Sequence, residues 1–139
     1  MDWLDRLPHQ PPMRLLEAVT AVDPGVSAVG RRVTAPQDFY FQGHFPGQPI
    51  VPAVILVELL AQVGGIAAAS SVAVTADVLP PALRVAALGA FKFPAAAVPG
   101  AVLEARAHVA GRLGRLIKIV GEVTADGVLV AAGSLTLAG

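Results

Sequence analysis

The chain has 139 residues, which suits one domain, and its formal net charge is zero. Hydrophobic residues make up 55% of it and charged residues 14%, below the roughly 25% of an average soluble domain, so we expect a homo-oligomer that buries part of this apolar surface. The ten Lys and Arg are scattered, which argues against nucleic acid as a partner, and the absence of Cys excludes disulfides and thiolate chemistry.

The first part of the chain reads as a hairpin followed by an irregular bend. Residues 2–7 resemble a short helical turn and lack the apolar run of a secretory signal, so we expect a cytoplasmic protein. Two strand-like runs, 14–22 and 26–34, flank the strong turn signal Asp23-Pro24-Gly25. The segment 35–52 is rich in Pro and Gly, which forbid regular structure, so an irregular bend is expected there.

A long apolar segment, 53–70, follows this bend. It contains no Pro and is long enough for about four to five helical turns. The segment is apolar nearly all round, so the rest of the fold must enclose it. A membrane span is disfavoured because Glu58 would place a carboxylate near the bilayer centre and no Lys or Arg flanks the segment. We therefore expect a buried helix in a protein without a membrane partner.

Strands dominate the remainder of the chain. A loop is expected over 71–82, and Asp126–Gly127 is the clearest two-residue hairpin signal in the sequence. The strand candidates of this part are 83–93, 101–111, 115–124 and 128–139. One enclosed helix and about five or six strands, joined mostly by hairpins, predict the α+β class: a single domain, 1–139, in which an antiparallel sheet wraps around one long central helix.

Two polar side chains interrupt the apolar helix, and a histidine precedes it. Glu58 and Gln62 are spaced to share one helix face. A buried carboxylate must be neutral, hydrogen-bonded or open to a cavity, so Glu58 is either a structural hydrogen-bonding group or a functional acid. His44 lies in a bend stiffened by Pro46 and Pro49. A single histidine is usually a satisfied surface or core residue, but beside such an acid it would form an acid–base pair.

Several motifs resemble the 3-hydroxyacyl-[acyl-carrier-protein] dehydratases of fatty acid synthesis. They are LPHQPP at 7–12, FQGHFPGQPIVP at 41–52 and ILVELLAQ at 55–62, and FKFPAAAVPG at 91–100 resembles a later motif of that family. The resemblance extends over nearly the whole chain. It implies the hotdog fold, in which a sheet wraps around a central helix, in agreement with the elements expected above.

The resemblance also implies an active site shared between two subunits. His44 of one chain would meet Glu58 of the other, and a 3-hydroxyacyl thioester of acyl carrier protein, or of CoA, would lose water to give the trans-2-enoyl thioester. His44 suits the base at the α-carbon and Glu58 the acid at the hydroxyl, although the reverse assignment, or one residue serving both steps, also fits these residue types. No cofactor and no metal site are visible. His9 is expected to hold the N-terminal segment and His108 to have no role.

Other residues have supporting roles in this interpretation. The backbone N–H groups of Ala53 and Val54, at the helix start, are free to bind the thioester oxygen. Gln62 either orients Glu58 or bonds the helix to a loop, and Gly47 supports the bend. The residues expected to line an apolar acyl channel, unless they are plain core, are Phe39, Phe41, Phe45 and Phe93.

The chain departs from the family pattern at several positions. The departures are Ala53 for the usual Gly, Pro94 and Ala95 for a Lys-Arg pair, and Ala101 for an acidic residue. The missing basic pair questions the carrier rather than the chemistry, since basic residues near the pocket would suit an acidic carrier protein. The remaining candidates for that surface are Lys92, Arg84 and Arg115.

Two other functions share these features. Hotdog thioesterases also place an acid on the central helix, so hydrolysis of an acyl thioester is an alternative. A non-catalytic subunit that binds acyl groups or pairs with an active partner is another, and the presence of both His44 and Glu58 argues against it. The sequence leaves open the acyl chain length, the carrier, the pathway, and whether the oligomer is a dimer or a trimer of dimers.

Overall fold

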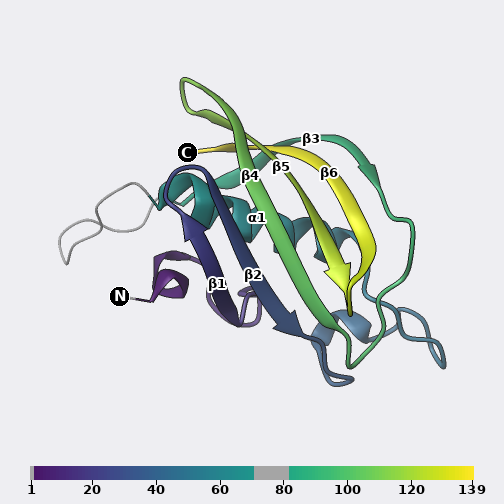
Figure 1. The fold of residues 1–139 in the computed structure, drawn as a ribbon. Helices are drawn as coiled ribbons and strands as arrows, with labels where there is room; N and C mark the ends of the chain where they lie inside the picture. Colours follow the sequence, from purple (N-terminus) through teal and green to yellow (C-terminus); the bar gives the residue numbers. More distant parts are fainter. Residues whose placement is uncertain (1, 71–81) are drawn as a thin grey trace.

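A curved antiparallel sheet wraps around one long helix in the computed structural model, which describes residues 2–70 and 82–139 (Figure 1). The strands lie in the order β1-β2-β4-β5-β6-β3. Their bounds are β1 Ala18–Asp23, β2 Ser27–Val33, β3 Arg84–Lys92, β4 Val102–Leu113, β5 Leu116–Ala125 and β6 Val128–Ala138, and the helix α1 spans Ala53–Ala69. This arrangement confirms the α+β class and the sheet around a central helix that the sequence predicts.

Local sequence signals place most of these elements correctly. At the Asp126–Gly127 turn both residues have positive φ, 49° and 83°, as a two-residue hairpin requires. Strand β1 begins at Ala18 rather than at residue 14, because the N–H of Leu15 bonds to a side chain of α1 instead of to a strand. The loop expected over 71–82 lies almost entirely outside the described residues. Short 3-10 helices, η1 Trp3–Arg6 and η2 Phe39–Phe41, occupy the N-terminal segment and the bend.

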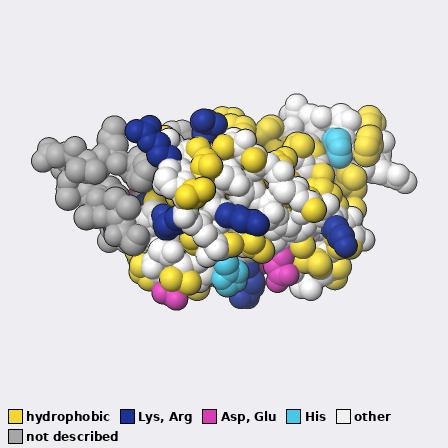
Figure 2. Space-filling model, turned by 90° about the horizontal axis from the view of Figure 1, so that it is seen from above, with side chains coloured by type: hydrophobic (Ala, Val, Ile, Leu, Met, Phe, Trp, Pro, Cys, Tyr) yellow, Lys and Arg dark blue, Asp and Glu magenta, His cyan; other side chains and the backbone are white. Residues whose placement is uncertain are grey.

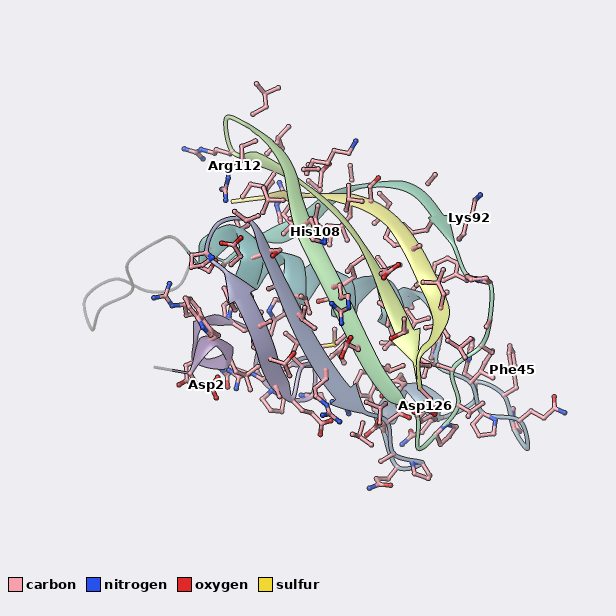
Figure 3. All side chains as sticks on the ribbon, viewed as in Figure 1. Asp2, Phe45, Lys92, His108, Arg112 and Asp126 are labelled. Carbon is pink, nitrogen blue, oxygen red and sulfur yellow. The ribbon has the colours of Figure 1, made fainter. Side chains whose placement is uncertain are left out.

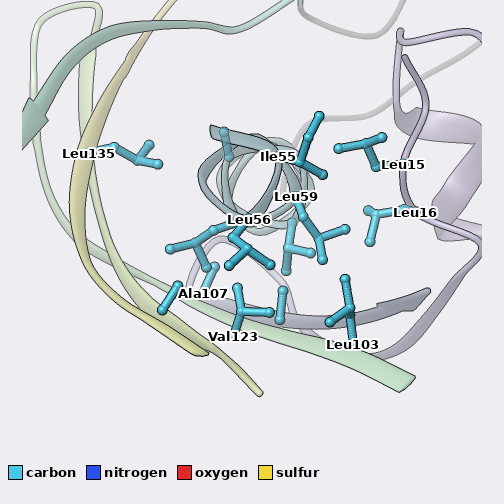
Figure 4. Close-up of a cluster of buried hydrophobic side chains, with 14 of the residues drawn as sticks. Leu15, Leu16, Ile55, Leu56, Leu59, Leu103, Ala107, Val123 and Leu135 are labelled. Atoms are coloured by element: carbon cyan, nitrogen blue, oxygen red, sulfur yellow. The ribbon is translucent and has the colours of Figure 1, made fainter. Parts of the chain in front are cut away.

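The side chains of α1 form the centre of the hydrophobic core (Figure 4). Of its 17 residues, 12 are buried, so the helix is enclosed as its all-round apolar character predicts. A Cβ atom at Gly64 would lie 2.9 Å from Cγ2 of Ile119, so glycine at this position lets the sheet approach the helix closely. Within residues 2–70 and 82–139, no helix has the length and hydropathy needed to cross a membrane.

Strand β3 is one of the two edge strands of the sheet, and its side chains are mostly exposed. It pairs with β6 on one side, and most of its residues are exposed, including Leu88 at 60%. Further large apolar side chains are exposed close to its end, at Phe93 and at Phe45. Figure 3 shows Phe45 and Lys92 toward the same end of the molecule. An exposed edge strand with apolar side chains is a surface on which another chain can pair.

Candidate active site

Hydrogen bonds fix the backbone of the bend that carries His44. The carbonyl of His44 accepts a bond of 2.9 Å from the N–H of Ile50. Between them Gly47 adopts φ 79°, a left-handed conformation that glycine allows without strain and that lets the chain reverse. The N–H of Val51 donates to the carbonyl of Ala97 at 2.8 Å, which ties the bend to the segment before β4. The irregular bend expected from Pro and Gly is therefore a well-bonded loop.

In the described ranges, one nitrogen of the His44 ring has a hydrogen-bond partner and the other has none. Its Nδ1 lies 3.0 Å from the carbonyl oxygen of Ile50, and because a carbonyl only accepts, Nδ1 carries the proton of the neutral ring. Nε2 then has a lone pair and can accept a proton. The half-buried ring stacks on Phe45, with 4.4 Å between centroids, and borders a cleft of about 520 Å³. His44 is thus equipped to act as a base in this cleft.

Glu58 projects from α1 into a different cavity. This cavity has a volume of about 230 Å³ and lies between α1, the N-terminal segment and the start of β3. Oε1 of Glu58 lies 3.1 Å from Nε2 of Gln62 and 3.4 Å from Nε2 of His9. Within one chain, His44 and Glu58 therefore line separate cavities.

Gln62 is almost completely buried and holds the carboxylate of Glu58 in place. Its Oε1 accepts from the N–H of Leu15 at 2.9 Å, and its Nε2 donates to the carbonyl of Met13 at 2.7 Å and to Oε1 of Glu58. The N–H of Leu15 needs an acceptor, so exchanging the positions of Oε1 and Nε2 of Gln62 would break these bonds. The orientation of the Gln62 amide group is therefore fixed. Gln62 therefore both bonds the helix to the N-terminal segment and positions the acid.

The start of α1 faces the cleft beside His44. Ala53 lines this cleft, and neither its N–H nor that of Val54 has a hydrogen-bond partner in the described part of the chain. Both groups lie at the positive end of the helix dipole. Pro94 and Ala95 line the same cleft, so the positions of the missing Lys-Arg pair border it with apolar side chains.

The four phenylalanines expected to line an acyl channel lie in different surroundings. Phe45 and Phe93 border the cleft beside His44 and are 54% and 42% exposed. Phe41 is buried in the core, and Phe39 packs edge-on against Tyr40 with 5.3 Å between ring centroids. In a single chain, Phe45 and Phe93 are therefore the phenylalanines that contribute to the apolar wall of the cleft.

A charged cluster that no sequence motif indicates anchors the bend to β2. Nη2 of Arg32 lies 2.9 Å from Asp38, its Nε donates to the hydroxyl oxygen of Tyr40 at 3.1 Å, and that hydroxyl donates to Asp38 at 2.7 Å. Burial alone would raise the pKa of Asp38, but hydrogen bonds from Ala35 N–H, Tyr40 and Arg32 outweigh it and lower the pKa below its usual 3.8. Burial and the bond to Asp38 raise the pKa of Tyr40 to about 12, against the opposing effect of Arg32.

We expect Arg32→Met to lower the free energy of unfolding at pH 7 by about 2–4 kcal/mol, because the largely buried Asp38 loses its counter-charge. The pKa of Asp38 is lower in the folded state than in the unfolded chain. The bonds of its carboxylate therefore stabilise the fold at pH values above the pKa in the unfolded chain, and this stabilisation is lost as the pH falls through the pKa in the folded state. The difference between variant and wild type should therefore shrink below about pH 4.

Urea unfolding followed by circular dichroism at pH 7 and pH 3 measures this difference. Arg31→Met is the matched control, since Arg31 is exposed on the same strand and should change stability by less than about 0.5 kcal/mol. An equal loss for the Arg32 variant at both pH values would contradict the role given to Asp38.

Comparisons with known proteins identify the family. The model of the FabA-like domain matches residues 7–134. The 3-hydroxyacyl-[acyl-carrier-protein] dehydratase FabZ of Anaeromyxobacter sp. is 36% identical, over 90% of this chain and 79% of that protein. FabZ of Moorella thermoacetica is 37% identical, over 99% of this chain and 96% of that protein.

A solved structure supports the hotdog fold independently of sequence. The dehydratase heterocomplex ApeI:P from Xenorhabdus doucetiae superposes with a TM-score of 0.76 at 19% identity, over 99% of this chain and 90% of that chain. At this identity the likeness concerns the fold alone, whereas the FabZ relatives are more than 30% identical in sequence over most of the chain. The chain therefore belongs to the FabA-like domain family, and its relatives there are 3-hydroxyacyl-[acyl-carrier-protein] dehydratases, as its motifs predict.

Proposed function

We propose that the protein is a cytoplasmic enzyme that dehydrates 3-hydroxyacyl thioesters to trans-2-enoyl thioesters in the synthesis of fatty acids or related polyenes and polyketides. The observation that carries this proposal is a histidine with a free Nε2 and a helix carboxylate held by Gln62, in a chain of this family. His44 takes the proton from the α-carbon and Glu58 protonates the β-hydroxyl, which leaves as water. The free N–H groups of Ala53 and Val54 stabilise the charge that develops on the thioester oxygen.

The two catalytic groups meet when two chains pair through β3. In one chain, the two sites lie at opposite ends of β3. Phe93, just beyond the end of β3, borders the cleft beside His44, and Arg84, at the start of β3, borders the cavity of Glu58. Antiparallel pairing of β3 with the same strand of a second copy, around Leu88, puts the end of each strand beside the start of the other. Each cleft then adjoins the acid cavity of the other subunit, which gives a homodimer with two shared sites.

Arg84 is the basic residue best placed to bind the carrier. It is exposed and lines the cavity of Glu58. It pairs with Ala138, whose neighbour on the other side is Leu116, next to the exposed Arg115. Figure 2 shows basic side chains among hydrophobic ones on one face of the molecule, where acidic side chains are fewer. A phosphate on the arm that carries the acyl group is an anion that such a guanidinium binds well.

We expect Arg84→Gln to raise KM for a carrier-protein-linked substrate about threefold to tenfold, the effect of losing one exposed contact of about 1 kcal/mol. The kcat should stay near the wild-type value, because Arg84 touches the carrier arm and not the reacting atoms. A short acyl thioester without a phosphate is the comparison substrate, and its KM should not change. Equal changes in KM for both substrates, or the same change in the exposed Arg31→Gln control, would contradict this assignment.

Incubation of the purified protein with enoyl thioesters of several chain lengths, on carrier protein and on CoA, tests the proposed function. Mass spectrometry should show addition of water to give the 3-hydroxyacyl thioester, and the reverse reaction from that product. Release of free thiol without hydration would instead assign a thioesterase. Stable acyl binding with neither reaction would assign a non-catalytic subunit.

A further inference from the structure

His9 is a polar residue that the proposed reaction does not use, and it lies against the acid. Its Nε2 is 3.4 Å from Oε1 of Glu58, with the two side chains 26% and 25% exposed. The segment that carries it is fixed, because Nε of Arg14 donates to the carbonyl of His9 at 2.9 Å. The N-terminal segment therefore holds an imidazole beside the carboxylate, a contact that the sequence does not indicate.

The other ring nitrogen shows where the proton of His9 lies. Its Nδ1 is buried without a hydrogen-bond partner, the one side-chain atom in this condition among residues 2–70 and 82–139. A proton on Nδ1 would bury an unpaired N–H donor, which is costly. The ring therefore carries its proton on Nε2, the nitrogen that faces Glu58.

Oε1 of Glu58 thus faces two N–H donors. Gln62 presents its Nε2 at 3.1 Å, in an orientation fixed by the N–H of Leu15, and His9 presents its Nε2 at 3.4 Å. A proton on Oε1 would point at these donors, so when Glu58 is protonated its proton sits on Oε2. In the described part of the chain, Oε2 has no donor of its own.

We propose that His9 is a positioning residue. Together with Gln62 it donates to Oε1 of Glu58, so that Oε2 is the oxygen that exchanges the proton with substrate. This inference rests on the proposed function, because it gives the acid of that reaction its orientation. The separation of 3.4 Å is longer than an ordinary N–H···O bond, and contacts of this kind in ligand-free enzymes tighten when substrate binds.

Two other charged groups lie around the pair of His9 and Glu58. Arg84 of β3 lines the same cavity, and Arg6 of η1, whose Nη1 donates to the carbonyl of Ser70, lines the adjoining one. Each presents a guanidinium group, which offers hydrogen-bond donors and accepts no hydrogen bond. Among the described residues that line these cavities, the ionisable side chains are therefore these two arginines, His9 and Glu58.

Two substitutions separate positioning from packing. His9→Leu removes the donor and keeps much of the volume, whereas His9→Gln keeps an N–H donor near the position of Nε2 but does not titrate. We expect His9→Leu to lower kcat about tenfold with little change in KM, and His9→Gln to stay within about threefold of wild type. His108→Leu, on the exposed face of β4 (Figure 3), is the matched control and should change neither constant.

The decisive measurement is the pH–rate profile of kcat. Because the carboxylate loses a donor that stabilises its charge, the limb that reports Glu58 should move to higher pH in His9→Leu and return in His9→Gln. A His9→Leu profile with unchanged limbs would overturn the proposal whatever the loss of rate, since loss of a donor to the carboxylate must alter the ionisation of Glu58.

Nitrogen NMR of the ring tests the same contact without activity. The chain has three histidines, so single substitutions assign the signals. His9 should show its proton on Nε2, and Glu58→Gln should perturb that nitrogen. A proton on Nδ1 would overturn the proposal. If the wild type shows the expected ring state but no hydration of enoyl thioesters, the proposed reaction fails while the His9–Glu58 contact stands.

Discussion

Replacing Glu58 with Gln is expected to lower kcat for dehydration by about 10²–10⁴-fold, the usual contribution of a positioned acid or base. The amide oxygen can still accept the bond from Nε2 of Gln62, so the helix and its surroundings should remain folded. An amide cannot release a proton to the departing hydroxyl, so the chemical step is lost. Steady-state assays with a 3-hydroxyacyl thioester, together with circular dichroism, measure both quantities.

His44→Ala should produce a loss of the same order. It removes the free Nε2 and the contact of Nδ1 with the carbonyl of Ile50, but it leaves the main-chain bond from the N–H of Ile50 to the carbonyl of His44. His108→Ala is the matched control, because it makes the same change on the exposed face of β4 and should retain wild-type activity. Wild-type rates in both active-site variants would remove the mechanism.

Mixing the two inactive variants should restore activity. In a dimer of one His44→Ala subunit and one Glu58→Gln subunit, one site carries both substitutions and the other keeps both catalytic groups. Random pairing makes half of the dimers mixed, each with one working site of two, so about a quarter of the wild-type activity is expected. The separate cavities of His44 and Glu58 in one chain are the reason for this expectation.

Co-expression with two affinity tags isolates the mixed dimer for assay. The control pairs His44→Ala with the double variant His44→Ala/Glu58→Gln, which leaves no site with both groups and should be inactive. A mixed dimer as inactive as its parents would show that the residues do not act across subunits.

The elements that the sequence predicts well are those decided by neighbouring residues. The helix over 53–69 follows from an uninterrupted apolar run after a proline, and the hairpin at Asp126–Gly127 follows from the φ angles that these two residues tolerate. The pairing of His44 with Glu58 is suggested by residue chemistry and by motifs, and the free Nε2 of His44 agrees with the base role.

The features that the sequence does not reveal depend on how separate elements pack against one another. Strand β1 is shorter than its composition indicates, because the N–H of Leu15 is taken by Gln62. The contact of His9 with Glu58 joins the N-terminal segment to α1, and the cluster of Arg32 with Asp38 joins β2 to the bend. No periodicity or spacing encodes such contacts, since they require the tertiary fold to exist first.

The amide of Gln62 couples the beginning of the chain mechanically to the reacting carboxylate. The side chain of Gln62 accepts a hydrogen bond from the N–H of Leu15 and donates one to the carbonyl of Met13. Its Nε2 also donates to Oε1 of Glu58. A load on the N-terminal segment, such as a bulky fusion partner, is therefore transmitted to the acid through a single rigid group.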